Sequence, residues 1–129
     1  MDVFEVRGFR SSLALGIAAK RQADQIKDVI TAEEIGQFGD QNIVEAISRI
    51  SGVSLTRNNG EGESVSIRGL SPTFTRVEVD GRSTVVTSDQ SNPTRASSLS
   101  NFSSDLYSEI EVIKSPRASD TEGGVGGIV

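Results

Sequence analysis

The clearest element of the sequence is a short helix over the stretch Asn42-Ile43-Val44-Glu45-Ala46-Ile47-Ser48-Arg49-Ile50-Ser51-Gly52-Val53. Asn42, followed three residues later by Glu45, forms a capping signature for the backbone N–H groups at a helix start. The three isoleucines recur at helical spacing and form one apolar face. Gly52 stands where a left-handed residue ends a helix, and Val53 supplies the hydrophobic contact that accompanies such an ending. The stretch therefore predicts an amphipathic helix that packs on a core.

Runs with the alternation of half-buried strands follow this helix at residues 53–56, 65–68 and 76–80. The last of these runs stops at Asp80-Gly81, which is a turn dipeptide. The connections at residues 57–63 and 70–75 are short and rich in Gly, Asn, Ser and Pro. Because such residues favour tight turns, we expect hairpins at both connections.

Two more strands and a second helix start flank this region. Residues 25–31 and 110–113 are apolar, β-branched runs, and Ser115-Pro116 ends the second of them. The sequence Thr31-Ala32-Glu33-Glu34 fits a capping box and predicts a short helical turn. The sum is an α+β fold, with a small sheet of about four short strands, two or three short helices and long loops.

Two segments differ from the rest of the chain. Residues 1–22 are expected to be a flexible N-terminal segment, and residues 23–129 to be the folded domain. Within the first segment, residues 3–10 alternate apolar and charged as a strand does, and residues 11–25 read as a weak helix or a linker. Residues 82–104 are rich in serine and predict a long loop. We expect residues 1–22 and 82–104 to be mobile.

Composition excludes several classes of function. The chain has no histidine and no cysteine, so it cannot form a Ser-His-Asp triad or a thiolate metal site. Its net charge is −5, from 18 acidic and 13 basic residues, and it has only five Phe and one Tyr. Neither the charge nor the aromatic content fits a nucleic-acid binder. No run of 18 apolar residues is present.

The remaining chemical signals favour no enzyme, cofactor or metal. The carboxylates of residues 105–120 lack the spacing of a calcium loop and are interpreted as surface acids. The glycine-rich residues 123–127 lack the Lys-Ser/Thr of a phosphate loop, so we interpret them as a tight turn. A Ser–Lys nucleophile stays open in principle, although no SxxK motif occurs. Arg68, beside Gly69, fits a surface arginine and a locking partner for an external acid equally well.

Four segments occur in a telling order: Val65-Ser66-Ile67-Arg68-Gly69, then Arg76-Val77-Glu78-Val79-Asp80-Gly81-Arg82, then Ile110-Glu111-Val112-Ile113-Lys114-Ser115-Pro116, then Gly123-Gly124-Val125-Gly126-Gly127. This order resembles the plug domain of TonB-dependent outer-membrane receptors. Residues 28–35 and 42–53 also resemble the opening strand and helix of that domain. Each segment is weak alone, whereas the set in register over residues 26–129 is specific.

The resemblance implies a four-stranded mixed sheet inside a 22-stranded β-barrel, in the outer membrane of a Gram-negative bacterium. It implies a plug that blocks the pore, helps to bind a small-molecule or oligosaccharide ligand, and is driven by the C-terminal domain of TonB. TonB would take up an N-terminal TonB box as an added β-strand. That box resembles the residues Val3, Phe4, Glu5, Val6, Arg7 and Gly8.

The resemblance also assigns site residues. The ligand-facing loops would contain Arg57, Asn58, Asn59, Ser71, Thr73, Phe74 and Arg82. Arg68 would face the barrel. The resemblance implies no cofactor and no metal.

The sequence departs from the family pattern in three places. Ser51 stands where a Pro often precedes the Gly-Val of the family. Lys114-Ser115-Pro116 replaces the Arg-Gly-Pro of siderophore receptors, which resembles receptors for carbohydrate uptake. The sequence stops at Val129, about where the first barrel strand is expected. The alternative function is a free-standing soluble periplasmic adaptor or ligand-binding module, against which the apolar, glycine-rich tail argues.

Overall fold

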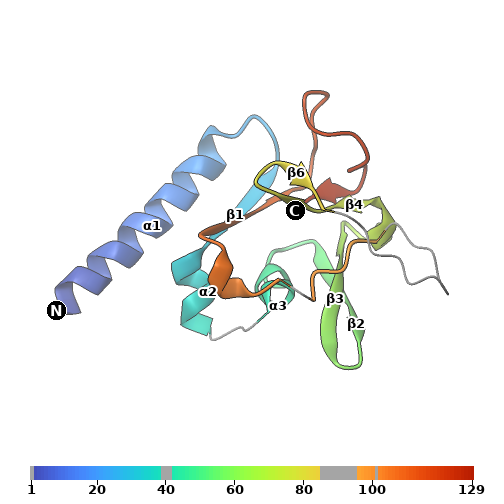
Figure 1. Ribbon diagram of the computed structural model, residues 1–129. Coiled ribbons are helices and arrows are strands. Elements are labelled where there is room, and N and C mark those ends of the chain that lie inside the picture. Colours follow the sequence, from blue (N-terminus) through green and yellow to red (C-terminus); the bar gives the residue numbers. More distant parts are fainter. Residues whose placement is uncertain (1, 39–41, 85–95, 101) are drawn as a thin grey trace.

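The computed structural model describes residues 2–38, 42–84, 96–100 and 102–129 (Figure 1). Its elements are α1 (Asp2–Gln22), β1 (Lys27–Thr31), α2 (Ala32–Phe38), α3 (Ile43–Ile47), β2 (Val53–Asn58), β3 (Glu61–Ile67), η1 (Pro72–Phe74), β4 (Thr75–Arg76), β5 (Glu78–Val79), β6 (Arg82–Ser83), η2 (Ser104–Leu106), β7 (Glu109–Ile113) and β8 (Gly127–Ile128). The predicted α+β class, with a small mixed sheet, is confirmed.

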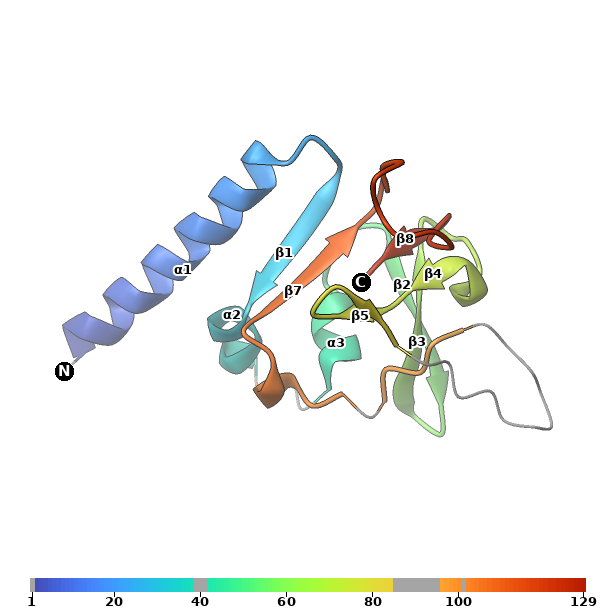
Figure 2. The same ribbon diagram turned by 45° about the horizontal axis from the view of Figure 1, so that its top comes forward.

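The main sheet has four strands in the order β1-β7-β8-β4 (Figure 2). β1 and β7 are antiparallel, with Ile30 opposite Ile110, and β4 runs parallel to β8. The sheet is therefore mixed, as expected, but its strands are not the expected set. Residues 53–58 and 61–67 form a separate antiparallel hairpin, and the glycine-rich tail supplies β8 in the middle of the sheet.

The residues that predicted the two helix starts form short-range capping hydrogen bonds. Asn42 Oδ1 accepts from the Val44 N–H at 3.0 Å and caps α3. Gly52 has a φ of +78°, as expected of a residue that ends a helix. At α2, the Glu34 carboxylate accepts from the Thr31 N–H at 3.0 Å, which is the reciprocal bond of a capping box. Both helix starts are confirmed, although α3 is regular only to Ile47.

The core lies between α3, the β2–β3 hairpin and the main sheet. Its largest fully buried side chains are Val44, Ile47, Ile67 and Val112. Each such side chain contributes roughly 1.5–3 kcal/mol on burial. Leu99, from the serine-rich segment, is only 2% exposed and belongs to this core. Part of that segment is therefore packed, while residues 85–95 and 101, also expected to be mobile, lie outside the described residues.

The expectation of a strand at residues 3–10 is wrong, because the backbone there is part of α1. Residues 11–22 contain Ala, Leu, Lys, Arg and Gln, which are good helix formers. Once a helix is nucleated it extends at little cost, so the preceding residues continue it. Figures 1 and 2 both place α1 along β1, on the side away from β7. Among the described residues, no helix combines the length and apolar character that crossing a membrane requires.

The expectation of a hairpin at residues 70–75 is also wrong. Ser71 caps η1 there, and the following strand pairs with β8 rather than with β3. The strand expected at residues 76–80 is divided, since Val77 is buried between β4 and β5. The turn expected at Asp80-Gly81 is confirmed: both residues have positive φ, and the turn joins β5 to β6.

Candidate functional site

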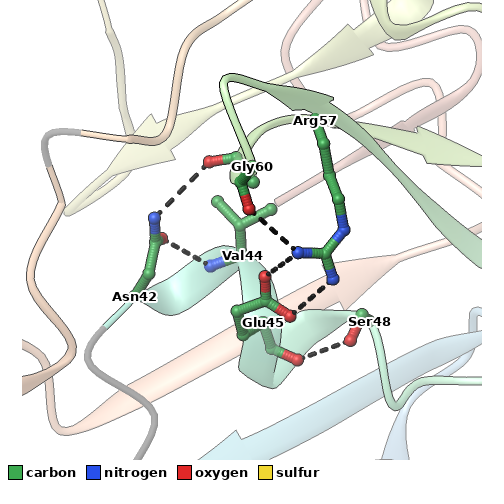
Figure 3. Close-up of polar contacts among 7 residues, drawn as sticks. Asn42, Val44, Glu45, Ser48, Arg57 and Gly60 are labelled. Atoms are coloured by element: carbon green, nitrogen blue, oxygen red, sulfur yellow. Dashed lines mark hydrogen bonds and ion pairs between the residues drawn. The ribbon is translucent and has the colours of Figure 1, made fainter.

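The tip of the β2–β3 hairpin is tied to α3 by a paired charge (Figure 3). Arg57 Nη1 lies 2.8 Å from Glu45 Oε1, and Arg57 Nη2 donates to Glu45 Oε2 at 3.1 Å. Arg57 Nη1 also donates to the Gly60 carbonyl at 3.3 Å. Glu45 thus bonds the hairpin, where sequence reasoning expected a bond to its own helix start. Arg57, expected to face a ligand, has an internal partner.

The Arg57–Glu45 pair is expected to hold the hairpin tip only weakly. The two side chains are 53% and 32% exposed, so solvent screens their attraction. A double-mutant cycle of Arg57→Ala and Glu45→Ala, measured by urea unfolding, should give a coupling energy of about 0.5–1 kcal/mol. The coupling should shrink in high salt. A coupling energy above about 2 kcal/mol would contradict this view of a weak, solvent-screened pair.

The expected ligand-facing residues fall into two groups at opposite ends of the hairpin. Asn58 and Asn59 are exposed in the tip turn, where Asn59 has a φ of +52°. At the other end, beyond Ile67, Ser71 and Thr73 share a hydrogen bond between their hydroxyls at 3.0 Å. β3 has seven residues, so the two groups are roughly 20 Å apart. The structure therefore does not bring all the expected residues together.

The second group includes an exposed apolar corner. Phe74 is 49% exposed, and Leu70 and Val125 are 42% and 77% exposed. The Gly126 N–H donates to the Phe74 carbonyl at 2.8 Å, which joins η1 to the glycine-rich tail. The remaining expected residue, Arg82, is exposed in β6. Sequence reasoning did not identify Leu70 and Val125, because isolated apolar residues in loops carry no pattern.

Arg68, expected to face the barrel, has an unusual backbone and is exposed. Its φ of +55° is uncommon for a residue with a side chain, and its N–H donates to the Gly52 carbonyl at 2.8 Å. Its Nη2 donates to Ser115 Oγ at 3.2 Å. A guanidinium has five N–H donors, so most of the Arg68 donors remain available to a further partner.

A charge cluster that the sequence did not reveal joins β1, β7 and α1. Lys114 Nζ lies 2.5 Å from Asp28 Oδ2 and donates to the Ser51 carbonyl at 2.6 Å. The other Asp28 oxygen pairs with Lys20 of α1. Burial by itself raises the pKa of Asp28, but hydrogen bonds from Lys114 and Lys20 outweigh it and hold the pKa below its usual value. Lys114 is only 8% exposed.

The expected TonB-box residues occupy the free end of α1 as seen in Figure 1. α1 contacts the rest of the domain further along the chain, where Ser12 Oγ donates to Glu33 Oε2 at 2.6 Å. This hydrogen bond is the main cause of a lowered pKa of the Glu33 carboxyl. Residues 3–8 precede this contact along the chain. Among the described residues, no group of His, Cys, Asp and Glu could hold a metal ion.

Comparisons with known proteins agree with this arrangement. Residues 19–128 match the model of a family described as the TonB-dependent Receptor Plug Domain. The chain is similar to the ferric enterobactin receptor PfeA of Pseudomonas aeruginosa (G324V mutant), with 30% identity and a TM-score of 0.63 over 86% of this chain. It is similar to the siderophore receptor PirA of Acinetobacter baumannii, with 26% identity and a TM-score of 0.64 over 85% of this chain. The chain spans 17% of the length of each of these receptors.

Proposed function

Since this chain belongs to the family of TonB-dependent receptor plug domains, we propose that it gates the pore of an outer-membrane transporter in a Gram-negative bacterium. The family match over residues 19–128 is the observation that carries the proposal. The fold suits a plug, because β8 at the C-terminal end lies between β7 and β4 and anchors the chain in its own sheet. The partner would be a 22-stranded β-barrel that continues the same polypeptide.

The gate would be opened through residues 3–8, which TonB would take up as an added strand. Val3, Phe4 and Val6 are β-branched or aromatic, and Gly8 is a poor helix former. These residues therefore have low helix propensity, and little free energy is needed to unwind the helix there. Because Ser12 contacts Glu33 further along α1, an unwinding that ends before Ser12 would leave this contact in place.

A titration of the labelled chain with the C-terminal domain of TonB tests this proposal. We expect NMR shift changes to centre on residues 3–8. Val6→Pro removes one strand hydrogen bond and should weaken binding by about tenfold. Val125→Asp, at an exposed site far along the chain, is the matched control and should bind as the unchanged protein does. Equal binding by Val6→Pro, or no binding at all, would favour the alternative of a free-standing periplasmic adaptor.

For the ligand, a ferric siderophore is the better-supported class. The similar solved receptors are named for ferric enterobactin and for siderophores. Lys114, part of the segment on which the carbohydrate-uptake expectation rested, is buried and bonds Asp28 and the Ser51 carbonyl. The comparisons give that expectation no support. We propose that the loops with Arg57 and Phe74 contact the ligand, and that Arg68 offers its free donors to a barrel carboxylate.

A further inference from the structure

The outer edge of β1 has unpaired backbone groups. The Lys114 N–H donates to the Ile26 carbonyl at 2.8 Å, and the Ala32 N–H donates to the Ser108 carbonyl at 2.9 Å. Since alternate residues of an antiparallel strand bond the same neighbour, the even-numbered residues of β1 bond β7. The N–H and C=O groups of Lys27 and Val29 therefore point away from the sheet. This is the geometry that accepts an added strand.

A groove lies beside this edge, on the core face of the sheet. It has a volume of about 380 Å³ and lies between β1, α2 and α3. Its lining is mixed: Ile30, Ile35, Ala46 and Ile50 form an apolar part, and Asp28, Glu34 and Arg49 add charged groups. Ile30 is opposite the buried Ile110, so the groove is on the inward-facing side of β1. A strand added to β1 would point every second side chain into this groove.

In the described state α1 covers the edge, but it does so loosely. A Cβ at Gly16 would lie 3.6 Å from Thr31 Cγ2, so the helix approaches β1 closely there. Of the helix residues from Arg10 to Gln22, whose side chains the structure describes, none is buried. Two further attachments among the described side chains are the contacts of Ser12 with Glu33 and of the exposed Lys20 with Asp28. Such contacts contribute little each, so α1 can leave without unfolding the core.

We propose that the edge of β1 and its groove form a docking site for an extended strand, and that residues 3–8 of this same chain occupy it when α1 leaves. In an extended conformation Phe4 and Val6 share one side, which suits the isoleucines of the groove. Glu5 and Arg7 then share the other side and face water. The tether of residues 9–26 is long enough for an antiparallel return and keeps the effective concentration high.

The test uses the full chain with α1 broken by Ala14→Pro and Lys20→Glu. Ala14 is exposed, so proline disrupts the helix without removing a packing contact, and the carboxylate that replaces the Lys20 ammonium repels Asp28. We expect the NMR shifts of residues 3–8 to change from helical to strand values. The outward Val29 amide should gain protection from hydrogen exchange. The Val112 amide, in the buried strand β7, should stay protected and so reports that the core is folded.

The control adds Val6→Asp in the same background, which replaces the apolar side chain that faces the groove by a carboxylate. It should lower the protection of the Val29 amide by about tenfold, the value of one lost hydrogen bond, and leave the protection of Val112 unchanged. Coil shifts at residues 3–8, or equal Val29 protection in both variants, would overturn the proposal. TonB is absent from this experiment, so its outcome is independent of the proposed function.

Discussion

Gly127→Ala is expected to lower the unfolding free energy by about 3 kcal/mol, because β8 has no room for a side chain. A Cβ at Gly127 would lie 2.5 Å from Ile67 Cδ1 and 2.7 Å from the Ile113 carbonyl oxygen. The second contact is with the backbone of β7, which cannot turn away as a side chain can. The φ of Gly127 is +145°, a conformation that residues with a side chain rarely adopt. Relief of the clash would therefore separate β8 from β7.

Gly60→Ala is the matched control. Gly60 also has a positive φ, of +90°, but a Cβ there would meet nothing within 4 Å. Alanine at this position should thus cost about 1 kcal/mol from backbone strain alone. Urea unfolding followed by circular dichroism compares the two variants with the unchanged chain. If both variants lost the same stability, the close approach of β8 to Ile67 and Ile113 would not matter.

The parts of the fold that the sequence predicted depend on contacts between near neighbours. Asn42 caps a helix two residues away, and Glu34 bonds the N–H of Thr31 three residues earlier. Asp80 and Gly81 form their turn together. Helix caps and turns each favour a few residue types. A single sequence is therefore enough to identify these local interactions.

The parts that it did not predict depend on distant residues. The turn expected at residues 123–127 is present, since the Gly127 N–H donates to the Gly124 carbonyl at 3.0 Å. The strand that follows it was not predicted: Ile128 pairs with Ile113 and completes the sheet. Glu45 was assigned to its own helix start, but it bonds Arg57, 12 residues away. Residues 3–10 have the alternation of a strand, but they continue the helix formed by the residues after them. In each case, tertiary contacts or the neighbouring helix override the local preference, which composition and spacing cannot show.

For the candidate site, the sequence identified residue types but not their grouping. Arg57 and Phe74 are exposed, as residues that contact a ligand must be, but they lie at different ends of the hairpin. The ion pair of Asp28 with Lys114 was not predicted, because the two residues are 86 positions apart in the sequence. A lone lysine after a strand gives no sign that it is buried, because its long side chain usually reaches solvent.

Asp28→Asn is expected to lower the unfolding free energy by about 3 kcal/mol at neutral pH, because it leaves a buried ammonium without its counter-charge. Among the described residues, the Lys114 ammonium would keep only the Ser51 carbonyl as a partner. Lys114→Met should cost less, about 1–2 kcal/mol, since Asp28 retains its pairing with Lys20. The double variant should cost less than the sum of the two, because neither charge is then left alone. Additive losses would show that the pair is not coupled.

The penalty of Asp28→Asn should also disappear in acid. The folded-state pKa of Asp28 lies below the unfolded value of about 3.9, since the hydrogen bonds from Lys114 and Lys20 outweigh the effect of burial. The stabilisation is therefore fully present above the unfolded pKa, and it is lost as the pH falls through the folded pKa. Below its folded pKa, the protonated Asp28 of the unchanged chain resembles Asn, so urea unfolding there should give nearly equal stabilities. A gap as wide in acid as at pH 7 would mean that the loss comes from packing and not from the charge of Asp28.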